Sequence, residues 1–439
     1  MRALLDGPAT GAEIEDASGA TTLPELRALA DRCEIEAKPL AGRRVGVRLH
    51  GEAASFALLA ALDALACDVF LFAGDLRDEA AVELGERLRL AAVLDADRSH
   101  TEVRSLRGEA PGSGASSLAI LTSGTTGAPK AVRHTWTSLL RPIRRRPELA
   151  GSAWLLCYRP HLYAGLQVAL QCLATGGRLV IPRPGAEPGE IARAARDAEV
   201  RFASATPSWW RRLLLLADPA LVSAIPLEQI TVGGECADQR TLDWLRRAFP
   251  AARLVHIYAT TELGRCFSVS DGRAGFPARL LDAPTPDGVE LRVESGELVV
   301  RSANAMQRYD AWGGARGEGG RWFRTGDLVE RHGDRMLFVG RRSDLINVGG
   351  AKVNPSQVER AIEAVAGVRD SRVFPRPSSL MGQLVACEIA VAPGHEPAHV
   401  IAAVHAHCRT VLAPHERPRL VQVVGQVATS PAGKKVRAA

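Results

Sequence analysis

The stretch that decides the fold runs from residue 44 to residue 72 and reads RVGVRLHGEAASFALLAALDALACDVFLF. Residues 44–49 and 69–72 are short runs built on Val, Leu and Phe, which is typical of buried strands. The apolar segment 55–67 between them is long enough for a buried helix. A strand, a helix and a strand in this order predict parallel strands joined by a crossover helix. The pattern recurs at residues 92–94, so we expect an α/β fold with helices on both faces of a parallel sheet.

The composition excludes several classes of protein. The chain has 439 residues, of which 46% are hydrophobic and 24% are charged, so a disordered chain, a collagen and a coiled coil are ruled out. No apolar run reaches the roughly 18 residues that a membrane-spanning helix needs, and the first residues hold no apolar stretch typical of a secretory signal. Eight cysteines without a CxxC pair are typical of reduced thiols rather than of disulfides or a zinc site. We therefore expect a cytoplasmic protein.

The charge pattern bears on the ligands. The formal net charge is +6, but the basic residues are dispersed and aromatic residues make up only 5%. We therefore expect no nucleic-acid partner. A modest positive balance suits a small phosphorylated ligand.

The second half of the chain has a different pattern of predicted secondary structure. Residues 288–293 and 297–300 predict two antiparallel strands around a Ser-Gly turn, and residues 336–339 predict another strand. The tail predicts a small α+β unit, with a helix from Pro355, strands at 371–374 and 384–391, and a helix at about 398–412. We expect two domains: residues 1–342, a large α/β domain with a β-rich subdomain, and residues 343–439, a small α+β domain.

The sharpest local signal is Leu-Thr-Ser-Gly-Thr-Thr-Gly-Ala-Pro-Lys at residues 121–130. Its glycines let the backbone approach a ligand and turn N–H groups toward it, its hydroxyls add donors, and Lys130 adds positive charge. This combination suits phosphate oxygens. The spacing of Gly124, Gly127 and Lys130 differs from that of a Walker loop, and no Ser or Thr follows the lysine. The alternative is an ordinary polar loop between a strand at 117–121 and the next helix.

Three further patterns are weak when each is taken alone. Residues 256–262, HIYATTE, follow a predicted strand and suit a nucleotide with a bound metal, although a strand end with a helix cap would also explain them. Residues 324–327 and Arg341 could grip the vicinal hydroxyls of a ribose or form a solvated ion pair. The basic tail at 430–435 is usually solvated charge.

Taken together, these patterns occur in a recognisable order. Seven segments of this chain resemble the motifs of the adenylate-forming enzymes, in the same order and with approximately the same spacing. They are residues 122–130, 233–235, 258–262, 325–327, 340–341, 349–350 and 431–434. That superfamily contains acyl-CoA and aryl-CoA synthetases, adenylation domains of peptide synthetases, and luciferases. The resemblance runs from about residue 40 to the end. It implies a large N-terminal domain and a small mobile C-terminal domain that carries a catalytic lysine.

The resemblance also implies which residues bind ATP. The β- and γ-phosphates would be held by Thr122, Ser123, Gly124, Thr125, Thr126, Gly127 and Lys130. The adenine would contact Gly234, Glu235 and Tyr258, and the ribose would be held by Asp327 and Arg341.

The catalytic roles follow from the same resemblance. Thr261 would contact the α-phosphate, Glu262 would bind Mg²⁺, and Lys434 would reach the reacting oxygens from the small domain. A tunnel for the pantetheine arm would be lined by Gly349 and Gly350, and the hinge would lie at Ser343.

The acid-binding residues implied by the resemblance are His161, Gly165 and Gly233. Apart from the resemblance, Trp209 of the Trp209–Trp210 pair is a candidate to line the acid pocket. Trp209 has an alternative role, which is to pack the start of a helix. In residues 154–165, where relatives that activate α-amino acids usually place an Asp, this sequence has no acid. Because an unpaired buried ammonium is costly, we expect a small carboxylic acid without an amine as the substrate.

The implied reaction has two steps. A carboxylate attacks the α-phosphate of ATP to give an acyl-adenylate and pyrophosphate, and the site offsets charge with Mg²⁺ and lysines. The thiol of coenzyme A, or of the phosphopantetheine on a carrier protein, then displaces AMP after the small domain has moved. We expect a carboxylate–thiol ligase, an acyl- or aryl-CoA synthetase.

Two alternatives stay open. The first is a stand-alone adenylating enzyme that loads a carrier protein, because such an enzyme has the same motifs. The second is a nucleotide-binding homologue without turnover, suggested by Ala259 and Ser343, where the family more often has Gly and Asp or Lys. Lys435 has the same charge as Lys434 one position on, so if Lys434 alone is catalytic, Lys435→Ala should keep most of the activity.

Overall fold

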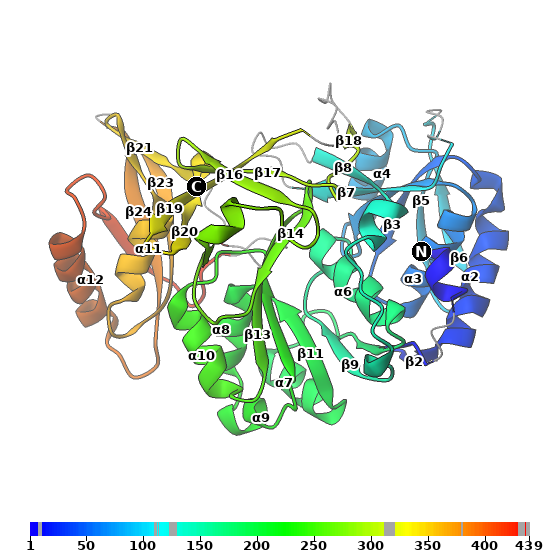
Figure 1. The fold of residues 1–439 in the computed structure, drawn as a ribbon, viewed down its shortest axis with the longest axis horizontal. Coiled ribbons are helices and arrows are strands. Elements are labelled where there is room, and N and C mark those ends of the chain that lie inside the picture. Colours follow the sequence, from blue (N-terminus) through cyan, green and yellow to red (C-terminus); the bar gives the residue numbers. More distant parts are fainter. Residues whose placement is uncertain are drawn as a thin grey trace. The chain divides into compact units, whose positions relative to one another are not determined.

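The computed structural model describes residues 1–7, 11–108, 112, 114–122, 130–310, 321–378, 381–428 and 435 (Figure 1). The chain divides into two compact units. Unit 1 comprises Met1–Ala274, Pro284–Glu290 and Arg301–Arg321, and unit 2 comprises Gly275–Ala283, Leu291–Val300 and Trp322–Ala439. The β-rich segments therefore group with the C-terminal residues by their contacts. This grouping does not test the predicted domain boundary at residue 342, which stays a prediction.

Unit 1 contains a seven-stranded sheet in the order β18-β8-β7-β4-β3-β5-β6. Its strands are β3 (Arg44–Leu49), β4 (Asp68–Ala73), β5 (Ala92–Ala96), β6 (Thr101–Ser105), β7 (Ser117–Thr122), β8 (Lys130–Thr135) and β18 (Arg308–Asp310). The four central strands are parallel, and β6, β8 and β18 are antiparallel to their neighbours. The predicted strand–helix–strand unit is confirmed, with α3 (Ala53–Ala64) as its crossover helix.

The second sheet of unit 1 has eight strands in the order β14-β13-β12-β11-β9-β10-β1-β2. They are β1 (Glu13–Asp16), β2 (Gly19–Thr22), β9 (Ala153–Leu156), β10 (Arg178–Val180), β11 (Val200–Ala205), β12 (Gln229–Gly233), β13 (Arg253–Thr260) and β14 (Gly264–Val269). Only β2 and β14, at the two edges, run antiparallel to their neighbours. One face packs on α7 (Pro188–Asp197), α8 (Pro207–Leu216), α9 (Pro219–Ser223) and α10 (Gln239–Ala248), drawn in green in Figure 1.

A layer of helices joins the two sheets of unit 1 through one hydrophobic core. It consists of α1 (Arg2–Leu5), α2 (Leu23–Ala37), α3 and α6 (Tyr163–Ala174). α4 (Asp78–Arg87) covers the other face of the first sheet, and α5 (Trp136–Leu140) follows β8. Residues 1–40 precede the part of the chain that the resemblance covers, yet Met1, Ile14 and Leu26 are buried in this core. The N-terminal segment is thus part of the large α/β body.

Unit 2 contains the β-rich segments. Their sheet has the order β15-β20-β19-β17-β16, with β15 (Phe276–Pro277), β16 (Glu290–Glu294), β17 (Glu297–Arg301), β19 (Phe323–His332) and β20 (Arg335–Arg341). Ser295 and Gly296 have φ angles of 49° and 74°, as a two-residue hairpin turn requires, so the predicted hairpin is confirmed.

The C-terminal part of unit 2 is a sheet with two helices. The sheet has the order β22-β21-β24-β23, with β25 beside β24. Its elements are β21 (Ile346–Val348), β22 (Ala351–Val353), α11 (Pro355–Glu363), β23 (Val368–Ser378), β24 (Gly382–Val391), α12 (Pro397–Val411) and β25 (Leu420–Val423). Val358, Ile362 and Val404 pack into its core, which confirms the predicted α+β tail. Among the helices of the described ranges, none has the length and apolar character to cross a membrane.

Candidate functional site

The loop at 122–130 joins two neighbouring strands, not a strand and a helix. Thr122 ends β7, Lys130 starts β8, and the two residues pair directly in the antiparallel ladder. The expected helix after the loop is wrong because buried polar residues hide the strand pattern of β8, where Arg133 pairs with Asp68 over 2.6 Å. The loop residues outside the described part of the chain are Ser123, Gly124, Thr125, Thr126 and Gly127, so their phosphate contacts stay predictions.

Lys130, Tyr309 and Glu262 form a connected group in unit 1. The Lys130 Nζ lies 5.6 Å from the centre of the Tyr309 ring, within cation–π range. The Tyr309 hydroxyl, on β18, donates to Glu262 Oε1 over 3.3 Å. Burial, together with the nearby carboxylate, raises the pKa of Tyr309, so the hydroxyl keeps its proton. One aromatic side chain thus bridges the loop lysine and the predicted magnesium ligand.

Thr261 and Glu262 occupy the turn between β13 and β14. The HIYATTE motif lies largely within β13 and a second strand follows it, so the alternative of a strand end with a helix cap is wrong. His134, on β8, is buried, and its Nε2 lies 2.6 Å from the carbonyl oxygen of Thr261. Burial lowers the pKa of His134, and the neutral ring can donate from this nitrogen. The backbone N–H of Met306 donates to the carbonyl of Glu262 over 2.6 Å, so the turn is held on two sides.

Glu262 fits a magnesium ion that is shared with a phosphate. Mg²⁺ keeps several waters and is commonly bound by one or two carboxylates together with substrate phosphates. Within the described ranges, no three or more His, Cys, Asp and Glu side chains are grouped so that they could hold a metal ion alone. A single carboxylate in the same group as Lys130 is what a metal–phosphate site of this kind needs.

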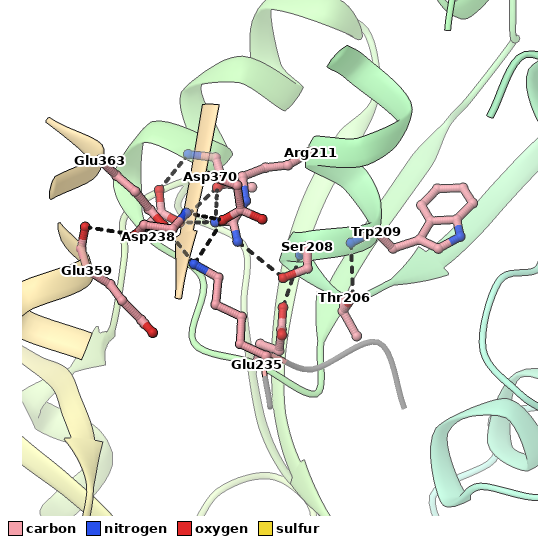
Figure 2. Close-up of polar contacts among 12 residues, drawn as sticks. Thr206, Ser208, Trp209, Arg211, Glu235, Asp238, Glu359, Glu363 and Asp370 are labelled. Carbon is pink, nitrogen blue, oxygen red and sulfur yellow. Dashed lines mark hydrogen bonds and ion pairs between the residues drawn. The ribbon is translucent and has the colours of Figure 1, made fainter. Parts of the chain in front are cut away.

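The 233–235 segment begins with the last residue of β12, at the carboxyl end of the parallel strands. Gly234 has φ +82°, a left-handed conformation that favours glycine. The carbonyl of Gly233 accepts a hydrogen bond of 3.1 Å from the Tyr158 hydroxyl. Glu235 Oε2 accepts the backbone N–H of Ser208, in the first turn of α8, over 3.0 Å (Figure 2). The segment is therefore tied to the loop after β9 and to α8.

Tyr258 lies on β13 and stacks on Phe267 of β14. Their ring centres are 5.2 Å apart and the rings are inclined by 22°. The adenine contact of Tyr258 stays a prediction.

Two of the predicted acid-binding residues have packing roles near the start of α6. His161 is buried, and burial lowers its pKa to about 4, an effect that Arg159 strengthens and Asp75 opposes. A Cβ on Gly165 would lie 2.2 Å from the carbonyl oxygen of Arg159, so this close approach requires glycine. Contact of either residue with a substrate stays a prediction.

Trp209 packs at the start of α8. Thr206 Oγ1 accepts its backbone N–H over 3.1 Å (Figure 2), and its ring meets Trp210 edge-on at 5.0 Å. Both rings line an apolar cavity of about 10 Å³ between the helices and the second sheet, which is at the lower limit for one water molecule. The alternative role of Trp209 in helix packing is thus confirmed, and its role in acid binding stays a prediction.

In unit 2, the predicted ribose pair Asp327 and Arg341 forms an ion pair of 2.6 Å. Gly349 and Gly350 have φ angles of +57° and +92° and form the turn between β21 and β22. Ser343 lies in the short 3₁₀ helix Arg342–Asp344. Their roles in nucleotide binding, the tunnel and the hinge stay predictions.

The two lysines of the tail differ in what the structure records. Lys434 lies outside the described residues, so its catalytic role stays a prediction. The side chain of Lys435 is only 9% exposed, and its Nζ lies 2.7 Å from Glu363 and 2.9 Å from Asp370. The interpretation of this tail as solvated charge is therefore wrong at Lys435.

Three structural residues of the site were not identified from the sequence. His134, Tyr158 and Tyr309 lie far in the chain from the groups that they hold. The local signal was only a polar or aromatic residue in an apolar strand or loop, which does not reveal its partner.

Known proteins share both sequence and fold with this chain. Residues 51–310 match the family model of the AMP-binding enzymes. A probable 2-succinylbenzoate–CoA ligase of Mycobacterium tuberculosis is 29% identical over 339 residues, which cover 73% of this chain and 83% of that protein. A medium/long-chain fatty acid–acyl-carrier-protein ligase of the same species is 26% identical over 388 residues, which cover 80% of this chain and 70% of that protein.

Solved structures share the arrangement of a large N-terminal and a small C-terminal domain. The anthranilate–CoA ligase AuaEII in complex with anthranoyl-AMP has a TM-score of 0.78 at 16% identity, over 99% of this chain and 95% of that one. ATP-bound MatB from Rhodopseudomonas palustris has a TM-score of 0.78 at 20% identity, over 99% and 96% of the two chains. These likenesses show the fold. Since the family model also covers more than half of the sequence, the chain belongs to the family of AMP-binding enzymes.

Proposed function

We propose that this protein is a carboxylate–thiol ligase. It uses ATP to convert a carboxylic acid into an acyl-adenylate with release of pyrophosphate, and it transfers the acyl group to a pantetheine thiol, that of coenzyme A, with release of AMP. The observation that carries the proposal is the Lys130–Tyr309–Glu262 group, which joins a cation and a carboxylate at the end of a hydroxyl- and glycine-rich loop. Membership in the AMP-binding family supports it.

The first step brings two anions together, so the site must offset charge. Lys130 and the loop at 122–129 hold the outer phosphates, and Thr261 donates to the α-phosphate. Glu262 holds Mg²⁺, which draws charge from the phosphate oxygens when it is bound. His134 and Tyr309 support this turn, so Thr261 and Glu262 need little rearrangement when ATP enters. Lys434 offsets charge between the carboxylate and the α-phosphate.

The nucleoside is held by two parts of the chain. Gly234, Glu235 and Tyr258 contact the adenine, and Asp327 with Arg341 holds the ribose hydroxyls. Vicinal hydroxyls both donate and accept hydrogen bonds, and a carboxylate with a guanidinium supplies the complementary acceptor and donor.

The second step needs different groups at the carbonyl, so residues 343–439 rotate about Ser343. Gly349 and Gly350 then line the path of the pantetheine arm. The cytoplasm, where thiols stay reduced, suits eight cysteines that include no CxxC pair.

Coenzyme A has one alternative as the thiol acceptor. The fatty acid relative is named for a carrier protein rather than coenzyme A, so a carrier-protein ligase is the second candidate. A nucleotide-binding homologue without turnover is less well supported, because Glu262, Asp327 and Lys434 are all present.

The test uses the purified chain with ATP, Mg²⁺ and a panel of carboxylic acids. Pyrophosphate release, with hydroxylamine to trap the acyl-adenylate as a hydroxamate, measures the first step. Thioester formation with coenzyme A, compared with a phosphopantetheinylated carrier protein, measures the second. Nucleotide binding without pyrophosphate release for any acid would overturn the proposal, and a thioester only on the carrier protein would favour the second candidate.

A further inference from the structure

Lys435 is one of only five lysines among the 55 basic residues of the chain. Its ammonium contacts two carboxylates at once, Glu363 Oε1 at 2.7 Å and Asp370 Oδ1 at 2.9 Å. With 9% of its side chain exposed, it differs from an ordinary surface lysine, whose ion pairs are screened by water and cost side-chain entropy. The two ion pairs therefore hold Lys435 in place.

The receiving carboxylates are themselves held in place. Glu363 is the last residue of α11, and its Oε1 accepts the Ser371 hydroxyl over 3.0 Å. Asp370 Oδ1 accepts the backbone N–H of Ser371 over 2.9 Å, and Ser371 is fully buried. Figure 2 shows the Glu363 and Asp370 side chains close together. We call these two carboxylates with Ser371 the acidic socket.

The socket is also fixed relative to the core of the C-terminal part. Glu359, one turn before Glu363 on α11, accepts the backbone N–H of Val373 over 3.0 Å, although its own side chain is buried. This bond sets the position of α11 along β23. The socket, formed by the end of α11 and the start of β23, thus belongs to the rigid part of this sheet-and-helix unit.

We propose that the acidic socket anchors Lys435 and thereby positions Lys434 for adenylation. Lys434 precedes Lys435 by a single peptide, whose Cα atoms are about 3.8 Å apart, so fixing Lys435 confines Lys434 to a short radius. Lys435 is then a positioning residue, and its charge does not enter the reaction. This inference rests on the proposed function, in which Lys434 must reach the oxygens between the acid and the α-phosphate.

The first test separates the two half-reactions. From the sequence alone, a substitution at Lys435 is expected to keep most of the activity, whereas an anchoring role predicts a loss. Lys435→Met removes the ammonium and keeps most of the length of the side chain. Because a shift of about 1 Å at a reacting group can cost roughly a hundredfold in rate, we expect the kcat of acyl-adenylate formation to fall about 10–100-fold with little change in KM. Thioester formation from acyl-adenylate supplied ready-made should stay within about twofold, because Lys434 takes no part in it. Lys434→Ala should show the same split with a larger loss.

Arg372→Met is the matched control. Arg372 and Glu388 form an ion pair of 2.7 Å in the same unit, with side chains 11% and 16% exposed. This variant removes a similarly buried pair that includes neither Lys435 nor its two carboxylates, so it should lower the melting temperature while changing both half-reactions in the same proportion. If Lys435→Met behaves like Arg372→Met, or leaves adenylation unchanged, the inference is overturned.

Two further comparisons address a merely structural role. Lys435→Arg should recover most of the adenylation rate. In the background of Glu363→Gln with Asp370→Asn, Lys435→Met should add little further loss, because the interaction has already been removed. Fully additive losses would show that Lys435 acts elsewhere.

A measurement that does not depend on catalysis tests whether the acidic socket holds Lys435. An amine-acylating reagent, followed by mass spectrometry, should modify Lys435 at least several-fold more slowly than the exposed Lys38 and Lys352. The Glu363→Gln, Asp370→Asn double variant should remove this protection. Absent protection overturns the anchor. If the wild type is protected but releases no pyrophosphate with any acid, the anchor stands and the proposed function fails.

Discussion

Asp327 and Arg341 face each other across two neighbouring antiparallel strands. They are direct partners in the β19–β20 ladder, and Arg341 Nε donates to Asp327 Oδ1 over 2.6 Å. Asp327 is largely buried, whereas about half of the Arg341 side chain is exposed. A buried carboxylate that is oriented by a more exposed guanidinium is suited to receive two adjacent hydroxyls.

We therefore expect Asp327→Asn to raise the KM for ATP in the pyrophosphate assay about tenfold or more. A hydrogen bond to a charged group is worth roughly 1.5–3 kcal/mol, and replacing the carboxylate also leaves the guanidinium with a weaker partner. Arg331→Ala is the control, since Arg331 lies on the same strand and donates to the carbonyl of Gly333 at the surface. An unchanged KM in Asp327→Asn would place the ribose elsewhere.

Tyr309→Phe tests the support of Glu262. The variant removes the hydroxyl that donates to Glu262 and keeps the ring beneath Lys130. One lost hydrogen bond to a carboxylate predicts a fall of about tenfold in adenylation rate, with more Mg²⁺ needed for half-maximal rate. Tyr309→Leu also removes the ring and should lose more. Equal rates in the wild type and Tyr309→Phe would contradict the support.

The substrate class follows from what residues 154–165 lack. No carboxylate occurs there to pair a buried ammonium. In the panel we expect aryl or short acyl acids to exceed α-amino acids in pyrophosphate release. A clear preference for a free α-amino acid would contradict this prediction.

Ser343→Pro tests the hinge. Ser343 is exposed, and its Oγ donates to the neighbouring Asp344 over 2.9 Å, so the side chain has no packing role that its loss would confound. Proline restricts φ to about −65°, so one orientation of the small domain should become harder to reach and one half-reaction should slow more than the other. Ser343→Ala should leave both rates near those of the wild type. Equal losses in Ser343→Pro would place the hinge elsewhere.

His161 predicts a pH dependence of stability. Burial lowers its pKa from 6.5 to about 4, so between these values the unfolded chain binds the proton that the folded chain refuses. The free energy of unfolding therefore falls as the pH drops from about 6.5 to 4, by on the order of 3 kcal/mol from this residue. Urea unfolding of His161→Gln should show a shallower decline over this window. The exposed His399→Gln should retain the wild-type slope, and identical slopes for all three proteins would refute the assignment.

Local pattern was enough to identify the elements that build the α/β body and the tail. The runs at 44–49 and 69–72 are strands, and residues 55–67 lie mostly in the crossover helix, because apolar periodicity and chain length decide such elements locally. The hairpin at Ser295 and Gly296 followed from turn chemistry in the same way.

The partners of polar side chains were decided only when the chain folded. After the loop at 121–130 the sequence suggested a helix, yet Arg133 and His134 lie on a strand. In the fold Arg133 pairs with Asp68, and His134 holds the turn at Thr261. From the sequence, Lys435 was one charge of a solvated tail. In the fold, α11 and β23 bring Glu363 and Asp370 together around its ammonium. The physical reason is that the periodic spacing of apolar residues, which determines a helix or strand, is set by residues close in sequence. The electrostatic environment of a charged side chain depends instead on groups distant in sequence.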